Sequence, residues 1–132
     1  MYWCAGDQLA LKILQLTNDP KNIVIGGFDW LPVILEKIQQ KEITASVGGH
    51  FLMVAIALVN IVDYEAGQNV FIEDPKLYKF ELITAKNVDS HISFFNNKGW
   101  NKVDFSHYLT SKNKHAPPVT ISNLMEQVNQ NE

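Results

Sequence analysis

The sequence predicts an α/β fold in which helices cover a parallel sheet to give three layers. Short apolar segments alternate with longer amphipathic ones over the first half of the chain, an order typical of strands joined by helical crossovers. Three apolar segments end in glycine and polar residues, as parallel strands do beside a ligand site. The 132 residues and the 46% hydrophobic content match a single globular domain.

The first strand and helix are expected at "MYWCAG" and "DQLALKILQLT". In the second segment Leu9, Ile13 and Leu16 recur at helical spacing and should form its buried face. Cys4 is the single cysteine of the chain, which excludes an internal disulfide, and its apolar neighbours predict a small buried side chain. No basic stretch of the kind that begins a signal peptide opens the sequence.

The next two strands are expected at "NIVIGG" and "EITASVGG", with the helix "WLPVILEKIQQ" between them. That helix places Leu31, Ile34, Leu35 and Ile38 on one apolar face. Strands joined in this way by helices form parallel pairs with right-handed crossovers.

The segment "HFLMVAIALVNIVDYEAG" predicts a long helix with Gly67 as its C′ residue and a solvated end at 63–65. From Phe51 to Val59 this helix is apolar on every side, whereas a surface helix has a polar face. We therefore expect it to be covered by another copy or another piece of protein. The apolar stretch from Phe51 to Val62 is shorter than the about 20 residues that span a bilayer.

The second half of the chain is less regular. A polar loop is expected around Glu73–Pro75, a strand within "KLYKFELIT" and a short helix capped by Asp89. After the polar residues that follow Ser111, an amphipathic helix is expected to dock as a tail. Its apolar positions are Ile121, Leu124, Met125 and Val128.

Several kinds of chemistry lack support in the sequence. The net charge is −3 and all eleven basic residues are lysines, so no nucleic-acid partner is expected. His91, His107 and His115 share no metal-ligand spacing and are expected at the surface. No nucleophile–base arrangement and no phosphate loop is present, so we expect neither an enzyme nor a cofactor or metal site.

Asp7, Asp29 and His50 follow the three predicted strands at their carboxyl ends. Those ends lie along one edge of a parallel sheet, where ligands bind. Each residue also has a structural interpretation. Asp7 and Asp29 can cap the helices that follow them, with Pro32 in the first turn of the second helix, and His50 can simply begin a helix. Trp30 can be a packing residue.

The segments "YWCAGDQLALKIL", "IVIGGFDWLPVILEKIQQKEITASVGGH" and "DYEAGQNV" resemble the latter half of the type I periplasmic sugar-binding proteins, from residue 2 to about 85. The effector cores of LacI-type regulators share this fold. The resemblance implies a partial C-terminal lobe (β-α-β-α-β) at 1–48 and a returning strand at 77–88. It further implies a helix and crossover at 49–76 that pack on an absent first lobe, and a C-terminal extension at 89–132.

The resemblance also implies roles for individual residues. Asp29 would be a ligand-facing carboxylate that accepts hydrogen bonds from adjacent sugar hydroxyls. Trp30 would stack on the sugar, and Asp7, Gly49 and His50 would complete the ligand-binding set. The sequence departs from the family pattern at Gly6, where asparagine is usual.

The implied function is sugar binding within a periplasmic protein that serves an ABC transporter permease or a membrane sensor, by closing around its ligand. The alternatives are the effector core of a LacI-type regulator and a small flavodoxin-like enzyme. A homo-oligomer is expected, because the Tyr2–Ala5 strand edge and the helix from Phe51 both lack a cover.

Overall fold

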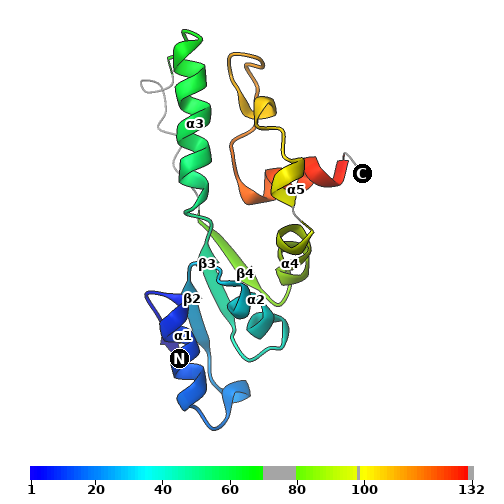
Figure 1. Ribbon diagram of the computed structural model, residues 1–132. Helices are drawn as coiled ribbons and strands as arrows, with labels where there is room; N and C mark the ends of the chain where they lie inside the picture. The colour runs from blue at the N-terminus through cyan, green and yellow to red at the C-terminus, as the bar shows by residue number, and fades with distance from the viewer. Residues whose placement is uncertain (70–79, 98, 131–132) are drawn as a thin grey trace. The chain divides into compact units, whose positions relative to one another are not determined.

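The computed structural model describes residues 1–69, 80–97 and 99–130 (Figure 1). They divide into two compact units. Unit 1 comprises Met1–Gly49 and Phe80–Asn97, and unit 2 comprises the described residues of His50–Lys79 and Lys98–Glu132. The chain therefore passes between the units three times, the first time directly after Gly49.

Unit 1 contains a four-stranded sheet in the order β1 (Tyr2–Trp3), β2 (Ile25–Phe28), β3 (Ala45–Gly48) and β4 (Glu81–Thr84). The first three strands are parallel, and β4 is antiparallel to β3. The expected α/β fold is confirmed, but the expectation of an entirely parallel sheet is wrong for β4. The chain leaves the sheet at the carboxyl end of β3 and re-enters it at the same edge, since Glu81 pairs with Gly48. A neighbouring strand that starts at that edge must run antiparallel.

Helices α1 (Asp7–Leu16) and α2 (Pro32–Gln39) pack on one face of this sheet, and α4 (Val88–Asn96) packs against α2. The connections from β1 to β2 through α1 and from β2 to β3 through α2 advance in the same direction across the sheet. Because such crossovers are right-handed, α1 and α2 lie on the same side of the sheet. The covered face carries Ile25, Ser46 and Ile83, which are fully buried. The remaining helical turn of unit 1 is a 3-10 segment at Pro20–Asn22.

The buried face of α1 differs from the expected one. Leu9 and Leu16 are exposed, and Ala10 is fully buried instead. The reason is the close approach of α1 to β2: a Cβ placed on Gly27 would lie 3.3 Å from the Ala10 Cβ. Only a small side chain fits at the point where the helix crosses the strand.

The opposite face of the sheet is partly open. Trp3 and Leu82 lie on it with 59% and 51% of their surface exposed. Phe28 and Val47 lie beside them in the pleat and are half-buried. The second helical layer that a three-layer fold requires is therefore not formed by the described residues of unit 1.

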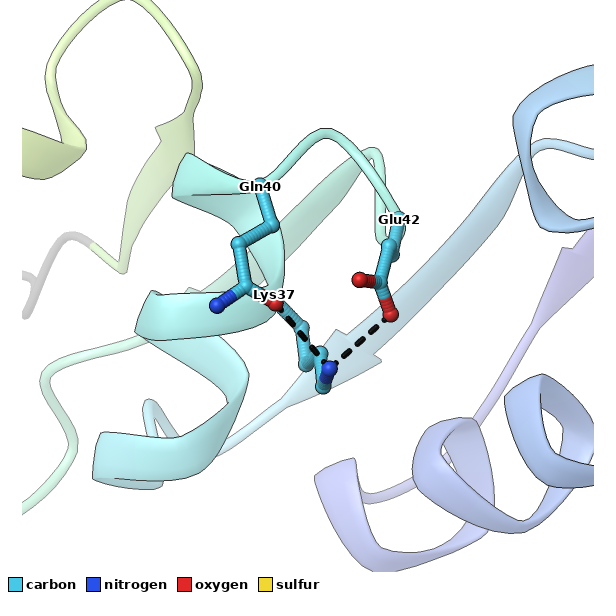
Figure 2. Close-up of polar contacts among 3 residues, drawn as sticks. All are labelled: Lys37, Gln40 and Glu42. Atoms are coloured by element: carbon cyan, nitrogen blue, oxygen red, sulfur yellow. Dashed lines mark hydrogen bonds and ion pairs between the residues drawn. The ribbon is translucent and has the colours of Figure 1, made fainter.

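A short turn connects α2 to β3 (Figure 2). Lys41 adopts a positive φ of 61°, and the Lys37 carbonyl accepts hydrogen bonds from the Glu42 and Ile43 N–H groups at 2.9 and 3.1 Å. The Lys37 Nζ lies 2.9 Å from the Glu42 Oε2 and donates to the Gln40 Oε1 at 3.0 Å, as Figure 2 shows. Because this ion pair is half-exposed, it stabilises the turn by less than about 1 kcal/mol.

Unit 2 contains α3 (Leu52–Glu65), the 3-10 segments η2 (Gly99–Lys102) and η3 (Phe105–Tyr108), and α5 (Ile121–Gln130). The expected C′ role of Gly67 is confirmed. Its φ is +81°, its N–H donates to the Tyr64 carbonyl at 2.9 Å, and the Gln68 N–H donates to the Asp63 carbonyl at 2.9 Å. These two bonds form a Schellman motif. The apolar face predicted for α5 is buried at Ile121, Leu124 and Val128.

Asp63 is not at a solvated helix end, as the sequence suggested, but is 1% exposed. Its carboxylate accepts four hydrogen bonds, from the N–H and hydroxyl of Thr110 at 2.8 and 2.6 Å and from those of Ser111 at 2.9 and 2.6 Å. Burial raises the pKa of Asp63, but the bonds from Ser111 and Thr110 outweigh burial and lower the pKa to about 2. The carboxylate therefore fastens the segment after η3 to α3.

The second half of the chain requires further corrections. Helix α4 begins at Val88 with Asn87 as its N-cap, whereas Asp89, the expected cap, accepts a hydrogen bond from the Gln39 side chain at 2.7 Å. Helix α4 belongs to unit 1, and the described residues from Gly99 onwards belong to unit 2. The polar loop expected around Glu73–Pro75 and the first residues of the returning strand lie outside the described residues. None of the helices in the described parts of the chain is long and apolar enough to cross a membrane.

Candidate functional site

The carboxyl ends of β1, β2 and β3 lie at one edge of the unit 1 sheet, because these strands are parallel. Asp7, Asp29 and Gly49 follow them at that edge. Phe80 and Glu81 reach the same edge because β4 starts there. We refer to this end of the sheet as the carboxyl edge.

The backbone turns sharply after β2. Asp29 and Trp30 have φ angles of 127° and 68°, a region that side-chain-bearing residues rarely adopt. The Asp29 N–H donates to the Val47 carbonyl at 2.9 Å, and the Leu31 N–H donates to the Asp7 Oδ2 at 2.8 Å. Two consecutive residues of this kind cost of the order of 1–3 kcal/mol each, so the surrounding bonds must hold them in place.

Asp29 does not cap α2. That helix begins at Pro32 with Leu31 as its N-cap and without a side-chain cap, so the capping interpretation is wrong, while Pro32 does occupy the first turn. The Asp29 side chain is half-buried and lies over Gly6, where a Cβ would be 3.6 Å from the Asp29 Oδ2. Its carboxylate is thus placed at the carboxyl edge, against the backbone of the neighbouring strand end.

Asp7 is fully buried behind this turn. Its Oδ1 accepts a hydrogen bond from the Ser46 hydroxyl and its Oδ2 one from the Leu31 N–H, both at 2.8 Å. Burial raises the pKa of Asp7, and the nearby Asp29 carboxylate adds to this rise. The hydrogen bonds that the Asp7 carboxylate accepts lower its pKa, but the net change is a rise. Asp7 is not the N-cap of α1 either, because Gly6 holds that position. It is a positioning residue that ties the strand ends together.

Trp30 is buried, with 5% of its surface exposed. Its Nε1–H donates to the Ser46 carbonyl at 3.1 Å, and a Cβ on Gly48 would lie 2.8 Å from the indole Cγ. The His91 ring packs edge-on at a centroid distance of 5.5 Å. The indole therefore packs inside unit 1, and the stacking on a sugar that the resemblance implies for Trp30 stays a prediction. The Phe80 side chain at the carboxyl edge is accessible, with 51% of its surface exposed. The centroid of its ring lies 5.2 Å from that of Phe28.

The histidines divide into one buried and three more accessible residues. His91 is 3% exposed, so its expected surface position is wrong; its Nδ1 lies 2.8 Å from the Asn87 carbonyl and donates to it. His107 and His115 are exposed, as expected. His50 is half-buried and belongs to unit 2, with its ring 6.0 Å from that of Phe51.

The structure thus brings together Asp7, Asp29 and Trp30 in unit 1 and places Gly49, with a φ of 96°, at the end of the adjacent strand. His50 is the first residue of unit 2. Sequence reasoning missed Ser46, which contacts both Asp7 and Trp30. A polar residue within the apolar strand "TASVGG" is the signal that could have pointed to it, because a buried hydroxyl requires a partner.

Unit 2 has a polar pocket of about 420 Å³ between η3 and α5. The Tyr108 side chain lines it, and the Tyr108 hydroxyl is buried without a hydrogen-bond partner among the described residues. Burial raises the pKa of Tyr108 to about 12, and the Glu126 carboxylate adds to this rise. In the described parts of the chain no group of three histidine, cysteine or acidic side chains is placed to hold a metal ion.

Comparison with known proteins gives a likeness of fold. No protein-family model matches the sequence, and no curated protein matches it. The crystal structure of a periplasmic sugar-binding protein from Pseudomonas fluorescens matches with a TM-score of 0.69 and 19% identity, over 94% of this chain. The match covers 40% of that protein, so the chain spans less than half of its length. The chain therefore has the periplasmic-binding-protein fold, over a part of that fold's extent.

Proposed function

We propose that the chain binds a small polyhydroxy ligand of the sugar class at the carboxyl edge of unit 1. The observation that carries this proposal is the strained backbone at Asp29 and Trp30. Strain of this kind persists where the surrounding structure enforces it, and it gathers at ligand sites. Here it directs a half-buried carboxylate to the edge of the sheet at which α/β proteins bind ligands.

The chemistry of this edge suits a sugar. An ionised carboxylate only accepts hydrogen bonds, and its two oxygens can serve two adjacent hydroxyl groups. Asp7, Ser46 and the Trp30 indole form a buried framework behind Asp29, so little freedom is lost when a ligand binds. We propose that the exposed ring of Phe80 packs against the C–H face of the sugar.

Gly49 stays in the proposed site with a smaller role, and the ligand-binding role expected of His50, the first residue of unit 2, stays a prediction. Gly49 directly follows β3, the last of the parallel strands. It has no side chain, it is buried, and its φ is positive. His50 follows it directly in the chain, and its imidazole can donate or accept a hydrogen bond.

The chain has part of the periplasmic-binding-protein fold, and this likeness supports a wider proposal. We infer a periplasmic solute-binding protein that delivers its ligand to an ABC transporter permease or to a membrane sensor. Because the matched portion amounts to 40% of the sugar-binding neighbour, we expect it to supply only part of a full sugar site. The expected affinity is therefore weak, with a Kd above about 1 mM.

Backbone amide NMR tests the proposal. Titration with a panel of monosaccharides should shift resonances around Asp29, Trp30 and Phe80 for at least one sugar. Asp29→Ala should abolish these shifts, because the loss of charge-assisted hydrogen bonds costs about 1.5–3 kcal/mol, or tenfold or more in affinity.

Glu36→Gln is the matched control, since it removes an equal charge from an exposed position on α2. It should leave the shifts unchanged. Shifts that persist in Asp29→Ala, with the near-ultraviolet signal of Trp30 intact, would exclude Asp29 from the site. Shifts confined to unit 2 would contradict the proposed location.

A further inference from the structure

The polar pocket of about 420 Å³ between η3 and α5, the η3–α5 pocket, takes no part in the proposed sugar site. The residues that line it all fall between Asp104 and Gln130, so one segment of unit 2 forms it. The Gln127 side chain holds its two walls together. The Gln127 Nε2 donates to the Asp104 carbonyl at 3.1 Å, and the Gln127 Oε1 accepts from the Asp104 N–H at 3.0 Å. Because these bonds are made within the protein, the pocket is formed before a ligand binds.

The Tyr108 hydroxyl is an unsatisfied polar group at this pocket. Tyr108 lines the pocket and is 1% exposed, and its buried hydroxyl has no hydrogen-bond partner among the described residues. Burial raises the pKa of Tyr108 to about 12, and the Glu126 carboxylate adds to this rise, so the hydroxyl keeps its proton at neutral pH. Glu126 also lines the pocket, so its effect on Tyr108 places the hydroxyl on that side. A buried O–H group without a protein partner indicates that another molecule supplies one.

The charge of the lining is negative. Asp104 and Glu126 contribute two carboxylates. His107 is the one described lining residue that can carry a positive charge, and its ring packs edge-on against that of Tyr108 at a centroid distance of 5.3 Å. The charge is therefore negative whichever form His107 takes. Carboxylates accept hydrogen bonds and do not donate them, so the lining favours a cationic ligand that donates.

We propose that the η3–α5 pocket binds a small organic ammonium ion that also carries a hydroxyl group. The ammonium group donates to the Glu126 carboxylate and balances the charge of the lining. The hydroxyl group of the ligand accepts a hydrogen bond from the Tyr108 O–H. A water molecule would satisfy Tyr108 but leave the carboxylates unbalanced. A metal ion is not favoured, because no group of three histidine, cysteine or acidic side chains in the described parts of the chain is placed to hold one.

Amide NMR of the full chain with three probes of similar size tests the proposal. Ethanolamine carries both groups, propylamine carries only the ammonium group, and 1-propanol carries only the hydroxyl group. Ethanolamine should shift the resonances of residues 104–108 and 123–130. It should bind about fivefold more tightly than propylamine, as expected for one additional hydrogen bond, and 1-propanol should cause no shifts.

Two variants separate the contributions of the hydroxyl and the charge. Tyr108→Phe removes the hydroxyl and keeps the ring, so it should reduce the affinity for ethanolamine to that for propylamine. Without ligand its urea midpoint should not fall, because the hydroxyl has no protein partner to lose. Glu126→Gln should weaken both amines about tenfold. Glu65→Gln is the matched control, since it removes an exposed charge from α3 in the same unit, and it should change neither affinity.

Four results would overturn the proposal. Equal binding of ethanolamine and propylamine to the wild type would exclude the hydroxyl contact, and the absence of shifts with both amines would exclude an ammonium ligand. Unchanged affinity in Glu126→Gln would place the amine elsewhere. A lower urea midpoint of Tyr108→Phe, with no binding of ethanolamine to the wild type, would show that water alone satisfies the hydroxyl.

Discussion

Asp7 and Asp63 are both buried, yet the pKa of the first is raised and that of the second is lowered. Burial acts in the same direction on both, since it disfavours the charged carboxylate. The difference lies in the donors. Asp63 accepts two bonds each from Thr110 and Ser111, whereas the Asp7 carboxylate has fewer donors and the Asp29 charge nearby. Asp63 is therefore suited to stabilising the fold, and Asp7 to holding a strained turn near a second carboxylate.

Asp63→Asn should lower the free energy of unfolding by about 2 kcal/mol at pH 7, because a pKa change from 3.8 to about 2 corresponds to that amount. The pKa in the folded state is the lower one, so the contribution of Asp63 is complete above about pH 4. It is lost as the pH falls towards 2. Urea unfolding of both proteins between pH 2 and 7 measures the difference, which should shrink over that interval.

Glu65→Gln on the same helix is the control for this experiment, because Glu65 is exposed, and it should change stability by less than about 0.5 kcal/mol. A difference between Asp63→Asn and the wild type that stays constant down to pH 2 would refute the assigned pKa.

At the scale of the elements, glycines decide how closely segments approach the sheet. Gly48 ends β3 directly beneath the Trp30 indole, and Gly26 in β2 lies beneath the ring of Trp3. The two tryptophans differ in freedom, since Trp30 is buried and hydrogen-bonded while Trp3 is largely exposed. The same added methyl group should therefore have different effects at the two positions.

Gly48→Ala should destabilise the protein by about 1–3 kcal/mol, because a Cβ at 2.8 Å from the Trp30 ring forces a buried side chain to move. Gly26→Ala should cost less than about 1 kcal/mol, since the exposed Trp3 ring can turn away. Chemical denaturation followed by circular dichroism compares the two variants. Equal losses of stability would show that Trp3 is held as firmly as Trp30.

At the scale of the whole molecule, the fold matches 94% of the chain but 40% of the sugar-binding neighbour. Two apolar surfaces remain partly exposed within the described residues. They are the face of α3 around Val54 and Leu58 in unit 2 and the sheet face around Trp3 and Leu82 in unit 1. Exposed apolar area of this extent favours association, because its burial releases water.

If the chain forms the homo-oligomer expected from its sequence, the melting temperature should depend on concentration. Association stabilises the folded state by mass action, so each tenfold increase in concentration should raise the Tm by a few degrees. Calorimetry over a hundredfold range of concentration measures this dependence. A wild-type Tm that does not change over this range would contradict a folding-linked homo-oligomer.

The sequence by itself determined the features that depend on near neighbours. The alternation of strands and helices, the Schellman motif at Gly67, the burial of Cys4 and the apolar face of α5 all follow from patterns within a few residues. The sequence also pointed to the strand ends at Asp7 and Asp29, since parallel strands bring those ends to one edge. The ligand-binding roles of the five predicted site residues stay predictions: Asp7, Asp29, Trp30, Gly49 and His50.

The tertiary structure decided the features that depend on distant segments. The direction of β4 follows from the edge at which the chain re-enters the sheet. Asp63 becomes a buried acceptor only because Thr110 and Ser111, 47 and 48 residues further on, supply donors. Trp30 is buried because Gly48 leaves room for its ring, and Asp7 positions the turn because Ser46 and Leu31 face it. A local pattern shows that a side chain is polar or large, but the packing of segments far apart in the sequence determines what that side chain contacts.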